Sequence, residues 1–204
     1  MTIANLPSRL SLSTAALDLV LNRVGRQLSL ESYGASGHTW IHKDGEGALF
    51  AVTVDGTRHT NITRNLIGVT VDYETAGVQH LIALFDSETF TVEHHLKVYQ
   101  DTALTESWQV IRCTGSAPIR VTRVDSVTID LPAEAYDLMY YTADWGSEFE
   151  PVQMPLSATK ILETRLGRSS KGMHPWFALT HSGGAVLSGS VAWSGNWALR
   201  FESL

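Results

Sequence analysis

Three carboxylates surround a tryptophan in the segment TADWGSEFEP. Asp144 precedes Trp145 directly, and Glu148 and Glu150 follow it a few positions later. A glycosidase needs two carboxyl groups placed across a sugar ring, and the flat apolar face of a tryptophan is a platform on which a pyranose can stack. The segment therefore indicates a sugar contact, with Trp145 as its candidate side chain.

Other tryptophans are candidates for the same role. Those that could stack on a sugar are Trp40, Trp145, Trp176, Trp193 and Trp197. In β-rich domains large aromatic side chains are more often part of the core than of a ligand site. From these residues alone, the interpretation stops at a β-sandwich in which carbohydrate binding is one open function.

The eight histidines of the chain raise the question of a metal site. His94 and His95 are adjacent in a strand-like segment, so their side chains point to opposite faces. His38 and His42 are four positions apart in a segment without helical character, which is a poor template for a paired metal ligand. The sequence predicts no metal site and no cofactor.

One enzymatic alternative stays open for this histidine pair. Glu93 and Glu106 lie close enough in sequence to His94 and His95 to share one sheet with them. A histidine and a carboxylate facing the same side of a sheet could exchange a proton with a sugar, as general acid–base catalysis requires. The strand register decides this alternative, and the sequence does not give it.

The segment SSKGMHPWFAL, residues 169–179, combines a polar loop with an aromatic strand. Pro175 fixes its own φ and sets a bend, and we expect the strand to begin at Trp176. The serines and His174 then supply local hydrogen bonds, so the segment is interpreted as support. The alternative is that Lys171 and His174 touch a sugar.

Apolar and polar residues alternate in segment after segment along the whole chain. This period of two is typical of strands with one buried face, and turn residues separate the segments at intervals of about ten residues. We therefore predict an all-β fold, most simply two large antiparallel sheets packed face to face, in one domain over residues 1–204. The least regular stretches, 31–47 and 142–157, are the loops expected to carry function.

Composition narrows the partners and the compartment. The formal net charge is −6 and no cluster of Lys and Arg occurs, which argues against nucleic acid. No apolar stretch is long enough to span a membrane. The single cysteine, Cys113, lies in a strand-like segment and is expected to be a buried, inert thiol. A cytoplasmic protein with no nucleic-acid or membrane partner is the expectation.

The order of segments along the chain resembles the N-terminal domain of glycoside hydrolase family 36, the bacterial α-galactosidases or melibiases and their relatives. The resemblance is carried by DWGSE, by the Gly-X-Ser-Ser loop ahead of PWFAL, and by WSGNW near residue 195. It implies a large two-sheet antiparallel β-sandwich, the supersandwich of galactose mutarotase-like proteins. It also implies that this piece packs on the catalytic barrel of a parent chain and forms a homo-oligomer.

The same resemblance implies retaining hydrolysis of α-galactosides by two aspartates of a following (β/α)8 barrel. The barrel is absent from these 204 residues, so no residue here is expected to be catalytic and the chain alone is expected to be inactive. An early loop of the family reaches the active site of a neighbouring subunit, and ESYGASGHTW stands in its place. His38 and Trp40 occupy the positions where Asp and Arg are expected, and with Trp145 they are the candidate substrate-binding residues. A free-standing carbohydrate-binding module is the alternative function.

Overall fold

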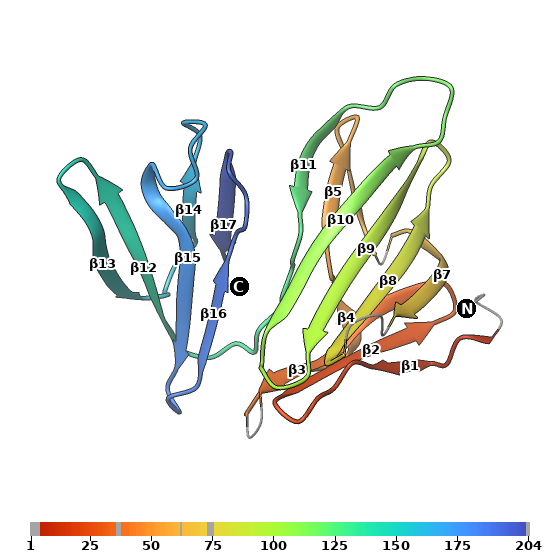
Figure 1. Cartoon of the computed structure of the whole chain (residues 1–204), viewed down its shortest axis with the longest axis horizontal. Coiled ribbons are helices and arrows are strands. Elements are labelled where there is room, and N and C mark those ends of the chain that lie inside the picture. Colours follow the sequence, from red (N-terminus) through yellow and green to blue (C-terminus); the bar gives the residue numbers. More distant parts are fainter. Residues whose placement is uncertain (1–4, 36–37, 62, 73–75, 203–204) are drawn as a thin grey trace. The chain divides into compact units, whose positions relative to one another are not determined.

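The computed structural model describes residues 5–35, 38–61, 63–72 and 76–202, with the side chains of 42–47 left out. The chain divides into two compact units, Met1–Leu131 and Pro132–Leu204, called unit 1 and unit 2 below. Every regular element in the described residues is a strand, and all the strand pairs are antiparallel (Figure 1). The predicted all-β sandwich fold is confirmed, while a single domain over 1–204 stays a prediction.

Unit 1 contains three sheets. The first has the order β1-β2-β3-β4, with β1 at Arg9–Ser11, β2 at Leu17–Val24, β3 at Gln27–Ala35 and β4 at His38–Gly47. The second has the order β10-β9-β8-β7, with β7 at Asn65–Asp72, β8 at Val78–Asp86, β9 at Phe90–Tyr99 and β10 at Thr105–Cys113. The third joins β11 at Val121–Asp125 to β5 at Ala51–Val54 and β6 at Thr57–Thr60.

The core of unit 1 follows the alternation seen in the sequence. In β8 the buried positions are Leu81, Ala83 and Phe85, with half-buried residues between them. Phe85 packs edge-to-face on Phe50, with ring centroids 5.3 Å apart. Such a contact adds to the free energy gained by burying the two rings.

A buried polar side chain joins the strands of unit 1. Asn61 has no exposed surface. It donates from Nδ2 to the carbonyl of Leu28 over 2.7 Å and accepts at Oδ1 from the amide of Leu49, also over 2.7 Å. The amide thus satisfies backbone groups of two distant segments that would otherwise be buried unpaired.

Unit 2 contains two sheets. One has the order β13-β12-β15-β16, with β12 at Tyr136–Asp144, β13 at Ser147–Pro155, β15 at Gly172–His181 and β16 at Val186–Ser190. The other pairs β14 at Lys160–Thr164 with β17 at Trp197–Phe201. Buried side chains of both sheets form the core, among them Leu138, Leu162 and Leu179. Trp197 is also buried and donates from Nε1 to the carbonyl of Ser169, so it belongs to this core.

Three local expectations were wrong. Residues 31–47 and 142–157 are largely paired strands, because β3 and β4 form a hairpin and so do β12 and β13. The strand expected at Trp176 begins at Gly172. Cys113 is exposed, because it is the last residue of β10, where the strand ends at the rim of its sheet.

No helix in the described part of the chain has the length and apolar character needed to cross a membrane.

Candidate functional site

His38 begins β4, opposite Ala35 of β3. The two strands approach unusually closely here, since a Cβ placed on Gly34 would lie 2.4 Å from the carbonyl oxygen of His38 and 2.7 Å from Cα of Thr39. Only glycine fits this approach, because real Cβ contacts are never that short. The glycine of the Tyr-Gly pair therefore sets the position of His38. Gly37 lies outside the described residues.

An open depression of about 370 Å³ lies beside His38. Its lining is mostly small and polar and consists of Ser13, Thr14, Ala15, Leu17, Asp18, Ala35, His38 and Thr39. Hydroxyl, carboxylate and imidazole groups are the groups that hydrogen-bond to sugar hydroxyls. In this lining the hydroxyl of Ser13 and the carboxylate of Asp18 are already hydrogen-bonded to each other.

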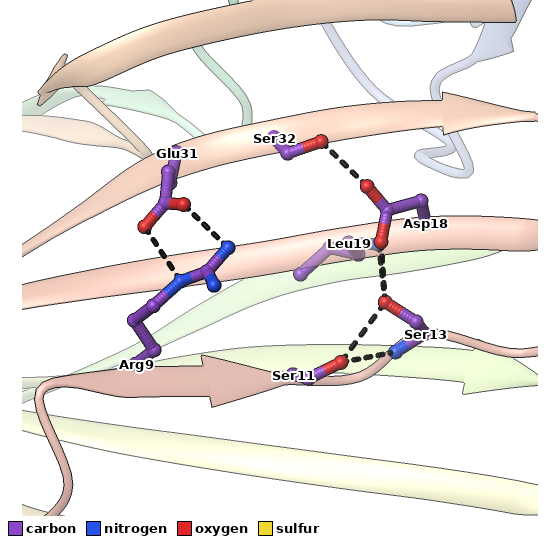
Figure 2. A network of polar contacts seen from close by, with 7 residues as sticks. All are labelled: Arg9, Ser11, Ser13, Asp18, Leu19, Glu31 and Ser32. Atoms are coloured by element: carbon purple, nitrogen blue, oxygen red, sulfur yellow. Dashed lines mark hydrogen bonds and ion pairs between the residues drawn. The ribbon is translucent and has the colours of Figure 1, made fainter.

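A polar network fixes one wall of this depression (Figure 2). The carboxylate of Asp18 accepts hydrogen bonds from the hydroxyls of Ser13 and Ser32, each over 2.6 Å. Ser11 donates in turn to the hydroxyl of Ser13 over 2.9 Å. Since each oxygen of Asp18 holds a short charge-assisted hydrogen bond, this carboxylate anchors the turn before β2.

A second contact in the same sheet ties the strands together. Arg9 of β1 reaches past β2 to Glu31 of β3, with Nη2 and Oε1 2.6 Å apart (Figure 2). The pair spans three strands, and with the serine network it links β1, β2 and β3 of this sheet. The candidate site is therefore built on a braced sheet.

Trp40 lies two positions after His38 in β4 and only 4 % of its surface is exposed. The two rings meet edge-to-face, with centroids 4.8 Å apart and an angle of 75° between their planes. Trp40 thus presents no free face on which a sugar could stack. Its place against His38 is that of a buried support for the imidazole.

Trp145 is the opposite case, with 96 % of its surface exposed. It occupies the turn between β12 and β13, where Gly146 takes φ of 77°. The carboxylate of Asp144 accepts from the backbone amide of Trp145 over 2.7 Å, and that of Glu150 accepts from the hydroxyl of Ser147 over 3.2 Å. These carboxylates stabilise the hairpin, and the side chain of Trp145 at its turn is open to solvent.

The structure brings His38 and Trp40 together in unit 1 and places Trp145 in unit 2. The sequence model for the glycosyl hydrolase family 36 N-terminal domain matches residues 8–204. The chain belongs to this family.

Relatives of the family share the fold at low identity. The α-galactosidase from Lactobacillus brevis superposes with a TM-score of 0.77 at 18 % identity, covering 99 % of this chain and 35 % of that one. α-Galactosidase AgaA from Geobacillus stearothermophilus superposes with a TM-score of 0.76 at 15 % identity, covering 95 % and 35 %. In sequence, AgaA is 28 % identical over 109 residues, 48 % of this chain and 15 % of its own length. The family-36 domain described here thus spans about a third of its structural relatives.

The family-36 domain also carries a histidine cluster that the sequence indicated only in part. His95 of β9 lies opposite Trp108 of β10, and their rings stack with centroids 4.7 Å apart. His80 of β8 joins them, with its Nε2 3.0 Å from Nδ1 of His95. The cross-strand register brings these three rings together, and only that register could have revealed His80 and Trp108.

Glu93 completes this cluster, with Oε2 3.5 Å from Nε2 of His95. Burial lowers the pKa of His95 and of His80, so both imidazoles are neutral at pH 7. A hydrogen bond from Arg112 lowers the pKa of Glu93 and keeps it ionised. Arg112 donates from Nε to Oε1 of Glu93 over 3.2 Å, so the carboxylate is shared between this arginine and the neighbouring His95.

His94 points to the other face of β9, where it is buried against Phe50 with ring centroids 5.0 Å apart. The prediction that His94 and His95 face opposite sides is confirmed. Within the described residues, no group of three or more His, Cys, Asp or Glu side chains is arranged to hold a metal ion.

Proposed function

We propose that this family-36 domain is a non-catalytic part of an α-galactosidase-type glycoside hydrolase. In this proposal it packs on the catalytic part of the enzyme and supports its assembly into a homo-oligomer in the cytoplasm. The observation that supports the proposal is the family match over residues 8–204. The region matched by this chain makes up only 35 % of each solved relative.

The second part of the proposal concerns the sugar. The imidazole of His38 and the hydroxyls beside it would contact the galactoside at the edge of an active site, and Trp40 would hold His38 in place from below. Trp145 would offer a stacking face at a second point of contact. Supporting this assignment are the half-buried imidazole, the polar depression and the braced sheet beneath it.

The carboxylates of the segment TADWGSEFEP support the non-catalytic role. A retaining glycosidase holds its two carboxyl groups about 5–5.5 Å apart across the scissile bond. Asp144 and Glu150 instead accept hydrogen bonds from groups of their own hairpin. We therefore assign the chemistry to the catalytic part of the enzyme.

The test is hydrolysis of a chromogenic α-galactoside by the complete gene product and by the 204-residue chain, assayed side by side. We expect turnover by the complete product alone. In that product, His38→Ala should raise KM about tenfold, the loss expected for one hydrogen bond to substrate, with kcat less affected. Turnover by the 204-residue chain would refute the non-catalytic role.

A free-standing carbohydrate-binding module is the second candidate, favoured by the exposure of Trp145 and of Trp193, which is 63 % exposed. It predicts that the 204-residue chain is retarded in a gel containing galactomannan and that Trp145→Ala abolishes the retardation. A chain that migrates identically with and without the polysaccharide excludes this candidate.

A further inference from the structure

Four aromatic rings from three neighbouring strands of unit 2 form one cluster, called the aromatic patch below. Its members are Tyr141 of β12, Phe149 of β13, and His174 and Trp176 of β15. Phe149 stacks on His174 with centroids 3.9 Å apart and an angle of 15°. Tyr141 contacts Trp176 at 5.3 Å and Phe149 at 6.1 Å. The patch is therefore continuous across the sheet.

Irregular pairing on the β15 side of β12 assembles half of the patch. Tyr140 pairs with Phe177 and Thr142 with Met173, so residues 174–176 lie opposite Tyr141 alone. Pro175 lies within this bulge, a position that proline tolerates because a ladder hydrogen bond is already missing there. In this arrangement both His174 and Trp176 lie within ring contact of Tyr141.

A second bulge on the β13 side completes the patch. Thr142 pairs with Glu150 and Asp144 with Ser147, so Glu148 and Phe149 lie opposite Ala143. Phe149 adopts φ of 58°, in the left-handed region that non-glycine residues avoid. The strand is thus bent so that the ring of Phe149 reaches His174.

This arrangement is unfavourable for unit 2 by itself. A strained backbone holds an apolar ring of which 61 % is exposed to water. Strained residues persist where the surrounding structure or a function imposes them, and exposed apolar clusters mark interaction sites. A surface that covers Phe149 would offset both the strain and the exposure.

We propose that the aromatic patch is the surface on which the catalytic part of the family-36 enzyme packs. This inference rests on the proposed function. About two thirds of each solved relative lies outside the region matched by this chain, so the domain needs an apolar surface for the remainder.

A protein partner also fits the geometry better than a sugar does. The plane of the Tyr141 ring makes angles of 39° to 86° with the planes of the three neighbouring rings. One face of Phe149 is already covered by His174. Such packing resembles half of a core, whereas a sugar stacks on open, coplanar faces.

Hydroxyl-radical footprinting of the complete gene product tests the surface directly. The matched control is Leu166, in the loop after β14, which is 65 % exposed against 61 % for Phe149. Each residue is normalised to its own labelling in the unfolded protein. We expect Phe149 to be labelled severalfold less than Leu166, because the core of an interface packs as densely as a protein interior and excludes solvent.

Substitution gives an independent readout in the same product. Asn tolerates the left-handed backbone, so Phe149→Asn removes the ring without adding strain. Phe149→Asn should lower the thermal midpoint of the complete product by more than it lowers that of the 204-residue chain, in which only the contacts of Phe149 with Tyr141 and His174 are lost. Leu166→Asn should leave both midpoints unchanged. An unshifted midpoint for Phe149→Asn contradicts the proposal.

The remaining outcomes separate the occupants and the two proposals. Equal labelling of Phe149 and Leu166 in a product that hydrolyses α-galactosides overturns the docking surface and leaves the proposed function standing. Absence of hydrolysis overturns the proposed function itself. Protection of Phe149 that disappears on dilution assigns the patch to a second copy of the chain, and protection that requires added galactoside assigns it to a sugar. Either result overturns the docking of the catalytic part.

Discussion

At the scale of single residues, His94 shows how the core of unit 1 limits the chemistry of its histidines. Its Nδ1 accepts a hydrogen bond from Gln109 over 2.8 Å, while its buried Nε2 has no hydrogen-bond partner in the structure. Burial, with a smaller contribution from neighbouring His95, lowers the pKa of His94 to about 3. A second proton would place an unsolvated positive charge on this ring, so the folded protein keeps the imidazole neutral.

This burial predicts sensitivity to acid. The unfolded chain takes up a proton near pH 6.5 and the folded chain only near pH 3, so stability is intact above pH 6.5 and is lost as the pH falls through this window. Between pH 7 and pH 5 the loss due to His94 is about 2 kcal/mol, from 1.36 kcal/mol per pKa unit. Urea unfolding of wild type and His94→Leu at both pH values measures it. Equal losses in the two proteins would contradict the prediction.

At the scale of elements, the β3–β4 hairpin shows how backbone geometry positions a candidate site. The close approach at Gly34 leaves no room for a side chain, and the obstructing atoms belong to the backbone of His38 and Thr39. Backbone atoms cannot move aside as the end of a flexible side chain can. The hairpin therefore fixes the backbone of His38 through its close approach to Gly34.

We expect Gly34→Ala to destabilise the protein by about 1–3 kcal/mol, the range for overpacking a tight site. The control is Gly115→Ala, where the nearest atom to a new Cβ is Cβ of Thr89 at 3.4 Å. That substitution should change the free energy of unfolding by less than about 0.5 kcal/mol. Denaturant midpoints of both variants decide the matter, and similar midpoints would mean that the hairpin adjusts to the methyl group.

At the scale of the whole molecule, the alternation of the sequence predicted much of the fold, because burial in β8 follows a period of two and so does burial at both ends of β9. Register could not be predicted, since it depends on bulges that no local pattern marks. For this reason the sequence predicts a loop over 142–157, where the structure has most of a hairpin, and it does not predict the contact of His80 with Trp108. Trp40 is a second example. Its spacing of two from His38 shows that both side chains lie on the same face of a strand, but its burial becomes evident only once the strand is placed in the sheet.

Net charge is the whole-molecule property that acts in the same pH range as His94. The formal charge of −6 at pH 7 vanishes near pH 5.7, and proteins without net charge associate. We expect light scattering to reach a maximum near pH 5.7 while far-UV circular dichroism stays native, because the folded state at that pH has lost only about 1 kcal/mol through His94. Clearing of the solution at lower pH, before the circular dichroism is lost, would identify charge neutralisation as the cause. Scattering that rises only together with loss of the native spectrum would instead assign the association to acid unfolding.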